Sequence, residues 1–457
     1  MWRGRPRAQV CRTRGWGRSP ARCRESLCHI PGGTRVLHVS GPPRTAAYAE
    51  DDALTMSTHH RPQAPAGQRN GPLLLQPVTG GEHAAFLRRP GPYTASFLQT
   101  PAWARVKTGW RSETLGWFDA DQRMVGSALV LYRRPPGVRR FFAYLPEGPG
   151  VDWADPQLER WLDPLLAHLA GTGAFAVRMG PPLAYRRWSA RTLKDAAGPG
   201  RRVGDVLPDL VEPLGTAVAD RLRESGWRRC GEDGQGVGVP PRRISGGAQP
   251  RLLFEVPLAG RGLDDLWTGL NQEWRRNIKK AAKSGVWTGV EGPQTLPAFH
   301  DLLRITERRD GFDLGRGLDY YQRQYAELNA ERPRSMRLYT ARHQGELLAA
   351  HTLLTAPDGN RVWYQTGASA DHRREVRPSN ALQWRMLCDA LLAGAAVYDM
   401  RGVPDDLDPA ARAHGLLRWK LGTGGEAVET VGEWELPLQG AVNKALHRAM
   451  HTYLTRR

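Results

Sequence analysis

Hydrophobic positions along the chain follow two patterns, short apolar runs and longer segments with helical periodicity. From residue 73 to about 180 these patterns predict a helix at 101–107, strands at 113–118, 124–132 and 140–145, an amphipathic helix at 156–169 and a strand at 174–179. Residues 194–250 are rich in Gly, Pro and Arg, and they yield one clear prediction, a helix at 216–226. Strands that alternate with helices in this way indicate an α/β protein.

The second half of the chain repeats this order. It predicts a strand at 252–256, a long helix at 264–284, helices at 299–309 and 318–328, strands at 336–342, 347–355 and 361–366, a helix at 379–392 and a strand at 397–400. In both 127–152 and 349–372, an apolar strand, a Pro-containing turn and an aromatic-rich strand precede a polar loop. We therefore predict a duplicated acyltransferase-like unit, with two unrelated α/β units as the alternative.

The N-terminal segment lacks these patterns. Residues 1–55 contain ten Arg and four acidic residues, many Gly and Pro, and no apolar core of a signal peptide. We expect residues 1–72 to be a disordered or wrongly assigned extension, with Met56 as a plausible start. No apolar run approaches the 18 or so residues of a membrane-spanning helix, so any membrane contact is expected to be peripheral.

The chain is strongly basic, with a formal net charge of +19. Removing the +6 of residues 1–55 leaves +13, which favours nucleic acid, anionic lipid surfaces or phosphorylated substrates as partners. The alternative is a GC-rich genome that places Arg on solvated faces, since 58 of the 65 basic residues are Arg. Beyond residue 55 the only cysteines are Cys230 and Cys388, which indicates a reducing cytoplasm and neither a disulfide scaffold nor a zinc site.

Six segments together resemble one family, the Fem (FemXAB) aminoacyltransferases that form peptidoglycan bridges. They are "FLQTPAWARVK" (97–107), "WTGLNQEWRRNIKKAAKSGV" (267–286), "TERRDGFDLGRGLDYYQRQY" (306–325), "VWYQTGAS" (362–369), "NALQWRMLCDALLAGAAVYDMRGV" (380–403) and "GLLRWKLGTGGEAVETVGEW" (415–434). In the first, Gln99, Trp103 and Lys107 are four residues apart and are expected to share one helix face.

The resemblance covers about 75–455 and implies an α/β fold with two tandem GNAT-like (acetyltransferase-like) subdomains. These are expected at 73–250 and 251–432, with 433–457 packing back on the first. Some members of the family insert a long helical arm, but the short turn at 356–361 implies that this chain lacks it.

The activity that the resemblance implies is transfer of an amino acid, expected to be glycine, from aminoacyl-tRNA to the stem-peptide amine of lipid II or its nucleotide precursor. It implies a cytoplasmic monomer that can touch the inner face of the membrane, with no cofactor besides the aminoacyl-tRNA co-substrate. The sequence contains no G-x-x-x-x-G-K-[ST] loop, nucleophile elbow or evident Cys–His pair, which favours direct attack by the substrate amine.

The resemblance also suggests site residues. Lys420, which follows Trp419, is expected to stabilise the oxyanion of the reaction. Lys107 and Arg309 resemble the residues that hold the diphosphate of the cell-wall precursor. Tyr321 and Tyr364 are expected to contact the acceptor peptide or sugar, with Trp419 beside them, although Tyr320 competes with Tyr321.

A basic helix face is expected to contact the tRNA backbone, with anionic lipid headgroups as the alternative partner. Its residues are Arg275, Arg276, Lys279, Lys280 and Lys283. No metal site is expected.

Three other functions remain open from the sequence. An acetyl-CoA-dependent acetyltransferase would need glycines in the loop 374–379, where Arg377 and Ser379 stand instead. A tRNA-dependent amide ligase of peptide natural-product biosynthesis would share the donor, and a non-catalytic RNA-binding module would share the charge. The sequence leaves open whether the acceptor is lysine or diaminopimelate, and alanine or serine could replace glycine.

Overall fold

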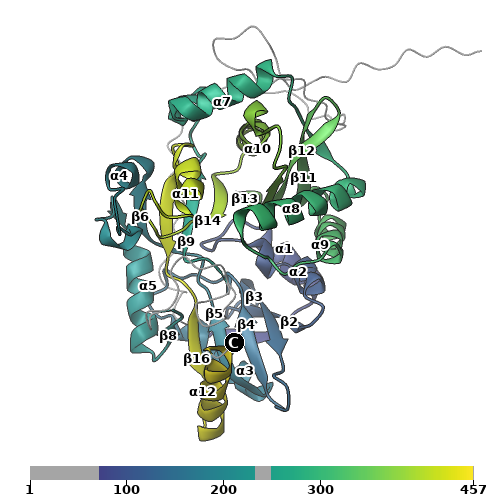
Figure 1. Cartoon of the computed structure of the whole chain (residues 1–457). Coiled ribbons are helices and arrows are strands. Elements are labelled where there is room, and N and C mark those ends of the chain that lie inside the picture. The colour runs from purple at the N-terminus through teal and green to yellow at the C-terminus, as the bar shows by residue number, and fades with distance from the viewer. Residues whose placement is uncertain (1–70, 232–248, 456–457) are drawn as a thin grey trace, which may run out of the picture. The chain divides into compact units, whose positions relative to one another are not determined.

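The computed structural model describes residues 71–231 and 249–455, which form two mixed β-sheets covered by helices (Figure 1). Nearly all of the expected extension, 1–70, lies outside the described residues. None of the helices in the described ranges is both long and apolar enough to span a membrane.

The first sheet has seven strands in the order β1-β2-β3-β4-β5-β16-β8. They are β1 (Leu74–Pro77), β2 (Arg111–Phe118), β3 (Met124–Arg133), β4 (Phe141–Leu145), β5 (Ala174–Met179), β16 (Trp434–Pro437) and β8 (Arg228–Arg229). Helices α1 (Gly80–Leu87), α2 (Pro101–Val106), α3 (Glu159–Gly171), α5 (Pro213–Glu224) and α12 (Ala441–Thr455) accompany it. Strand β3 is buried over most of its length, which explains why its sequence is a continuous apolar run instead of an alternating one.

The second sheet has nine strands in the order β10-β11-β12-β13-β14-β9-β15-β6-β7. They are β10 (Trp287–Glu291), β11 (Met336–His343), β12 (Glu346–Thr355), β13 (Arg361–Ser369), β14 (Val397–Gly402), β9 (Leu252–Pro257), β15 (Glu426–Thr430), β6 (Ala184–Ser189) and β7 (Leu210–Val211). Its helices are α4 (Ala190–Asp195), α6 (Leu263–Gly269), α7 (Gln272–Lys283), α8 (Leu296–Asp310), α9 (Leu318–Glu331), α10 (Pro378–Leu392) and α11 (His414–Leu421). Helix α10 is buried around most of its circumference because it lies between the sheet and α7.

The predicted duplication is visible in the strand order. In the first sheet, antiparallel strands β2-β3-β4 lead through α3 to β5, which is parallel to β4. In the second, antiparallel β11-β12-β13 lead through α10 to β14, which is parallel to β13. The prediction of an α/β protein with two GNAT-like units is thus confirmed, and no helix in the described ranges exceeds 15 residues, so the long arm is absent there.

The chain exchanges strands between the two sheets. Strands β6 and β7 belong to the second sheet, although the sequence assigns their residues to the first subdomain. Conversely, β16 pairs with β5 and α12 contacts β5, both in the first sheet. An apolar cluster containing Phe97 and Trp363, with ring centroids 4.9 Å apart, also joins the two halves.

Two predicted helices differ from the structure. The segment predicted as one helix at 264–284 is two, α6 and α7, because Leu270 is extended and the Asn271 side chain caps α7 by accepting a hydrogen bond from Trp274 N (2.9 Å). Gln99 precedes α2 in a short 3-10 turn, Phe97–Gln99, so it does not share a helix face with Trp103 and Lys107. Its amide instead binds Leu129 N and Pro146 O (2.9 and 2.8 Å) inside the first subdomain.

Candidate functional site

Three cations gather where α2 meets the loop before α9, and we call Lys107, Arg133 and Arg316 the cationic cluster. The Lys107 ammonium lies 4.9 Å from the centre of the Trp103 ring and 6.0 Å from that of Tyr320. The Arg316 guanidinium lies 4.8 Å from the centre of the same Tyr320 ring. The Arg133 guanidinium lies 5.5 Å from the centre of the Trp110 ring.

The cationic cluster has an excess of positive charge. Burial, reinforced by Arg316 and Arg133, lowers the pKa of Lys107 to about 8. Among the described residues, no acidic side chain forms an ion pair with any of the three cations. Like charges without a counterion destabilise the site, and an anion bound there would remove that cost.

Arg309, the arginine expected beside Lys107, has other partners. Its guanidinium pairs with Asp310 (2.8 and 2.9 Å) and donates to Ser369 O and Ala370 O (3.3 and 3.2 Å), which ties the end of α8 to the end of β13. Arg316, and not Arg309, is the arginine near Lys107 in this part of the structure. The available signal was its position between Gly315 and Gly317 in a loop, four residues before Tyr320.

The two neighbouring tyrosines, Tyr320 and Tyr321, lie in different surroundings. Tyr321 is fully buried against Phe299 and Tyr320, with ring centroids 5.2 and 5.3 Å away, so it packs in the core. Its competitor Tyr320 is the tyrosine that contacts the cationic cluster.

Tyr364 and Trp419 lie together on the second subdomain, with ring centroids 6.4 Å apart. Trp419 also packs against Trp274 at 5.1 Å and accepts a hydrogen bond from its indole N–H at its backbone oxygen (2.8 Å). A Cβ on Gly367 would overlap the Tyr364 hydroxyl, so the glycine makes room for this ring.

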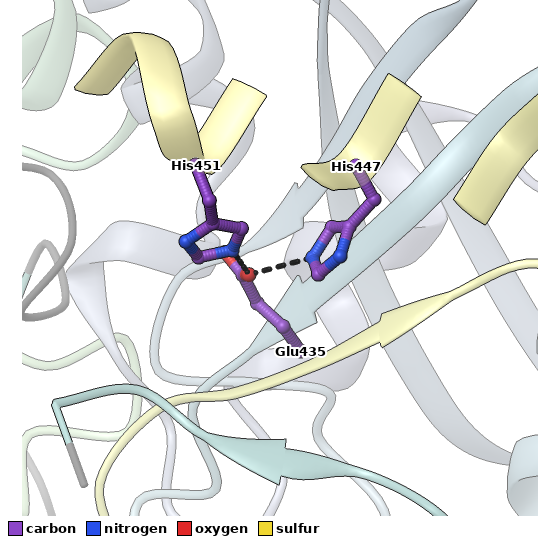
Figure 2. Close-up of side chains that lie close together, drawn as sticks. All are labelled: Glu435, His447 and His451. Carbon is purple, nitrogen blue, oxygen red and sulfur yellow. Dashed lines mark hydrogen bonds and ion pairs between the residues drawn. The ribbon is translucent and has the colours of Figure 1, made fainter. Parts of the chain in front are cut away.

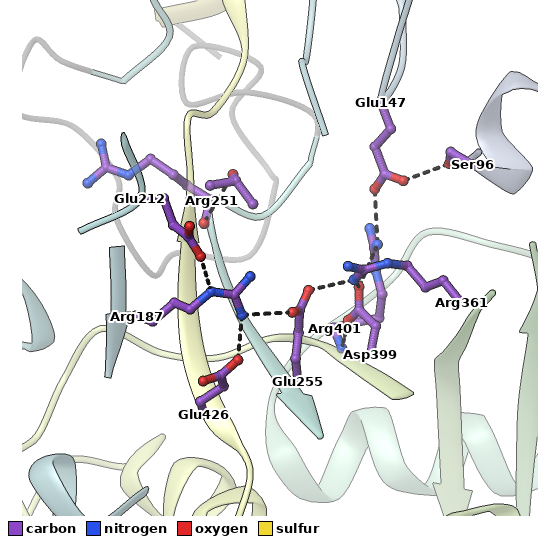
Figure 3. A network of polar contacts seen from close by, with 11 residues as sticks. Ser96, Glu147, Arg187, Glu212, Arg251, Glu255, Arg361, Asp399, Arg401 and Glu426 are labelled. Carbon is purple, nitrogen blue, oxygen red and sulfur yellow. Dashed lines mark hydrogen bonds and ion pairs between the residues drawn. The ribbon is translucent and has the colours of Figure 1, made fainter. Parts of the chain in front are cut away.

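A cavity of about 300 Å³ lies where the two sheets approach each other, near the ends of β9 and β14. Its lining includes five carboxylates and two guanidinium groups, which belong to Glu147, Glu212, Glu255, Asp399, Glu433, Arg187 and Arg361. Figure 3 shows how most of them are linked. Arg361 donates to Glu255 (2.5 Å) and Asp399 (3.3 Å), and Arg187 pairs with Glu212 (2.5 Å) and Glu426. Burial raises the pKa of Asp399, although Arg401 and Arg361 oppose this shift.

Arg401 joins this network from an unusual backbone position. Its φ is +61°, in the left-handed region, where a residue with a side chain is strained by about 1–3 kcal/mol. The pairing of β14 with β9 shifts register between Asp399 and Gly402. The resulting bulge directs the Arg401 guanidinium to Glu147 (3.0 Å) and Gln249 (2.8 Å).

Lys420, the expected oxyanion-stabilising residue, holds this bulge. It is 3% exposed, on α11, and its ammonium donates to the backbone oxygens of Met400 (2.7 Å), Arg401 (3.3 Å) and Gly402 (2.8 Å). Burial lowers its pKa to about 7 against the opposing effect of Asp399. Its ammonium is thus directed at three successive carbonyls of its own chain, those of residues 400–402.

The glycines after Lys420 allow close packing. A Cβ on Gly422 would overlap Trp274, one on Gly424 would overlap Gly269 O, and one on Gly425 would overlap Glu255 O. These glycines therefore bring α11 and β15 against α6, α7 and β9, which fixes Lys420 below the bulge of β14.

Aromatic residues connect the cationic cluster with the cavity. The Arg133 guanidinium lies over the Trp110 ring. The centroid of that ring is 6.1 Å from the centroid of the Tyr144 ring. The Tyr144 hydroxyl donates to Glu433 (2.6 Å), which lines the cavity, and accepts from Gln249 (3.4 Å). The two features therefore lie along one continuous set of contacts.

The basic residues expected to bind tRNA lie on the outer side of α7. Arg276, Lys279, Lys280 and Lys283 are exposed, whereas Arg275 is partly buried and donates to Thr268 O (3.2 Å). On the opposite side of the helix, Trp274, Ile278 and Ala281 are buried. None of the five basic side chains pairs with a carboxylate in the part of the chain that the structure describes.

The loop that corresponds to an acetyl-CoA phosphate site lies beside α7. It contains the 3-10 turn η5 (Arg374–Val376), which contacts α7, and it leads into α10. Arg373 and Arg377 have φ values of +50° and +58°. Glycine is favoured in this conformation, yet both positions carry long side chains.

Known proteins match most of this chain. The FemAB family model matches residues 78–332, and an acetyltransferase (GNAT) domain model matches residues 270–420. The "Lipid II:glycine glycyltransferase" of Staphylococcus aureus (strain USA300) is 22% identical over 428 residues, covering 79% of this chain and 92% of that protein. The crystal structure of FemX superposes with a TM-score of 0.66 at 21% identity, covering 83% of this chain and all of FemX. Because the first model spans more than half of the residues, this chain belongs to the FemAB family.

Proposed function

We propose that this protein transfers an amino acid, glycine in our expectation, from aminoacyl-tRNA to the stem-peptide amine of lipid II or its nucleotide precursor. It would act as a monomer in the cytoplasm, at the inner face of the membrane. The observation that carries the proposal is the cationic cluster, which has three cations and no acidic partner among the described residues. The similar S. aureus protein, named for lipid II and glycine, agrees with this assignment.

The cationic cluster suits the diphosphate of such an acceptor. Arg316 and Arg133 can each offer two parallel hydrogen bonds to phosphate oxygens, and Lys107 adds a mobile point charge. With a pKa of about 8, Lys107 is mostly protonated at neutral pH, and a bound phosphate would raise that pKa further. The rings of Trp110 and Tyr320, which are only partly buried, offer flat surfaces for an attached sugar.

The cavity suits the reacting ends of the two substrates. The acceptor amine attacks the ester carbonyl of the donor, the new C–N bond forms, and the C–O bond to the ribose breaks. The proton lost from the amine ends on the ribose oxygen, which leaves as a hydroxyl group. The buried carboxylate of Asp399, whose pKa is raised by burial, could carry that proton between the two atoms.

Arg401 would stabilise the negative charge that develops on the carbonyl oxygen, because its guanidinium reaches the network beside the cavity from the bulge of β14. In this proposal Lys420 contributes as a positioning residue. Its ammonium binds the carbonyls of residues 400–402 and so maintains the strained backbone that presents Arg401.

The donor would dock through the basic face of α7. A polyanion such as tRNA gains affinity from each phosphate that an exposed Lys or Arg neutralises, because counterions are released. The arginines of the neighbouring η5 loop add positive charge next to the basic face of α7.

The test is a transfer assay with charged glycyl-tRNA, a lipid II analogue and the purified protein. We expect a product that carries one or more additional glycine residues by mass spectrometry, and we expect ribonuclease treatment of the donor to abolish it. Free glycine with ATP should give no product. Ribonuclease-resistant transfer, or transfer from acetyl-CoA in its place, would refute the tRNA-dependent function.

A further inference from the structure

The C-terminal helix meets the first sheet through two histidines and a glutamate, outside the site described above (Figure 2). His447 and His451 extend from α12, and Glu435 extends from β16. The Nε2 atoms of the two histidines lie 2.9 and 2.6 Å from the same atom, Oε2 of Glu435. All three potential ligand atoms lie within 4.8 Å of one another.

The backbone brings these three side chains close enough together to hold a metal ion. Residues four apart on a helix lie on the same face, so His447 and His451 both point at the strand below. Glu435 is 2% exposed and His447 is 9% exposed, while the His451 side chain is 35% exposed. Two ligands are thus shielded and the third reaches solvent, which leaves a route for an ion and for a bound water.

The charges around the cluster also permit a cation. Arg178 is shared between Glu435 and Glu433, since it donates to Glu435 Oε1 (2.6 Å) and lies 3.8 Å from Glu433 Oε2. The second oxygen of Glu435, Oε2, faces the two histidines and is available to a cation between them.

A second, independent feature is a polar atom that lacks a partner one turn earlier on α12. Asn443 is 6% exposed, and its side-chain N–H donates to Gln439 O (2.8 Å). Its side-chain oxygen has no hydrogen-bond partner among the described residues. A buried oxygen without a donor is costly, and a metal-bound water would be one way to satisfy it.

We propose that Glu435, His447 and His451 bind one Zn²⁺ ion, which fastens the C-terminal helix to the first sheet. Two imidazoles and one carboxylate with an open fourth position form a common zinc ligand set. In binding, each histidine would carry its remaining proton on Nδ1, so that Nε2 is free to coordinate. The proposal goes beyond the transferase function and does not depend on it, and it differs from the expectation that the chain has no metal site.

The test uses the full-length protein without a histidine tag, after removal of metal by a chelator. Zn²⁺ is titrated by calorimetry, and Co²⁺ binding is followed by its visible absorption. We expect one ion per chain, a higher thermal midpoint with Zn²⁺, and at least a tenfold loss of affinity in His451→Ala. His451 is partly exposed near the end of a helix, so this variant should still fold.

The matched control is His372→Ala, which removes a histidine paired with Glu346 (2.7 Å) on the exposed surface of the second subdomain. This variant should bind Zn²⁺ as the unaltered protein does. Absence of stoichiometric binding in the micromolar range would overturn the proposal, as would equal affinity in His451→Ala and His372→Ala. In either case the cluster would be an ion pair that anchors α12.

Discussion

At the scale of single residues, two partly or fully buried lysines have lowered pKa values for different reasons. Lys107 lies near two arginines and two aromatic rings, with no acidic partner in the described ranges, so its charge is available to a ligand. The ammonium of Lys420 is enclosed by three backbone carbonyls, so its charge stabilises its own chain. The same residue type therefore serves binding in one place and backbone geometry in the other.

We expect Lys107→Ala and Arg316→Ala to weaken binding of the acceptor by about 1.5–3 kcal/mol each, because each removes a charge-assisted contact to the diphosphate. The measurement is the KM for a lipid II analogue, compared with that for the same peptide without its diphosphate. Arg309→Ala is the control, because Arg309 is already paired with Asp310. If Arg309→Ala raised the KM as much as Arg316→Ala, the assignment of Arg316 would be wrong.

We expect Lys420→Met to lower the transfer rate about a hundredfold, the usual loss when one oxyanion-stabilising donor is displaced. If Lys420 acts by positioning Arg401, the double variant Lys420→Met/Arg401→Ala should be no slower than the slower single variant. Single-turnover rates of the four proteins give this comparison. If the rate loss in the double variant equals the product of the losses in the two single variants, the two residues act independently.

Lys444→Met provides a control for the loss of a lysine, because Lys444 is exposed on α12. It should retain both rate and stability. Lys420→Met should in addition unfold at a lower temperature. The substitution removes the hydrogen bonds that the ammonium donates to three buried carbonyl groups.

At the scale of elements, helix α7 is defined by the break before it. The cap at Asn271 starts α7 as a helix separate from α6 and lets it take its own direction, so that one side packs on α10 and the other carries unpaired basic residues. In a single continuous helix from 264 to 284, the basic residues would point in a different direction relative to α10. The cap therefore decides which residues form the basic face.

Replacing Lys279, Lys280 and Lys283 together by Ala should make the affinity for tRNA depend less steeply on salt concentration. The expected change corresponds to the loss of up to about three phosphate contacts. The slope of log Kd against log salt concentration measures this number. A matched variant with Arg139, Arg140 and Arg191 replaced by Ala removes the same charge from exposed positions on other elements. Equal slopes in the two triple variants would place the tRNA elsewhere.

At the scale of the whole molecule, neither sheet is built from one continuous part of the chain. The first sheet needs β16 from the C-terminal end, and the second needs β6 and β7 from the first half. The cavity lies where these exchanged strands meet, because its lining comes from both sheets. Formation of the cavity thus requires both halves of the chain.

A protein that begins at Met56 should fold and transfer amino acids as the full chain does. Both sheets and the helices around them lie within residues 71–231 and 249–455, and the first strand begins at residue 74. Circular dichroism, the thermal midpoint and the transfer rate provide the comparison. A loss of folding or of rate in the shortened protein would mean that residues 1–55 contribute to the fold.

Much of the fold could be predicted from the sequence. Strands β2, β3, β5, β11, β12 and β13 and helix α10 lie close to their predicted positions, because their apolar residues are continuous or periodic enough to mark them. The sequence does not predict β1, β6, β7, β8, β10, β15 or β16. They are short or lie at positions where neighbouring strands, and not local pattern, stabilise them.

The candidate site was predictable only in part. Composition drew attention to the basic residues of α7, and the family resemblance drew attention to Lys107 as a candidate site residue. The choice of Arg316 over Arg309 and of Tyr320 over Tyr321 did not, because it depends on where the loop between α8 and α9 passes α2. The bulge at Arg401 also had no local signal, since its left-handed backbone is stabilised by Lys420 from an element 19 residues further on.

The sequence by itself determined the class of the fold, its internal duplication and the excess of positive charge, because periodicity and composition are properties of neighbouring residues. Only the tertiary structure decided which strand joins which sheet, which arginine stands beside Lys107 and where the Lys420 ammonium points. These features depend on contacts between residues far apart along the chain, such as Glu435 with His447 and Lys107 with Tyr320. The free energy of such contacts comes from burial and electrostatics in the folded molecule, which local pattern does not encode.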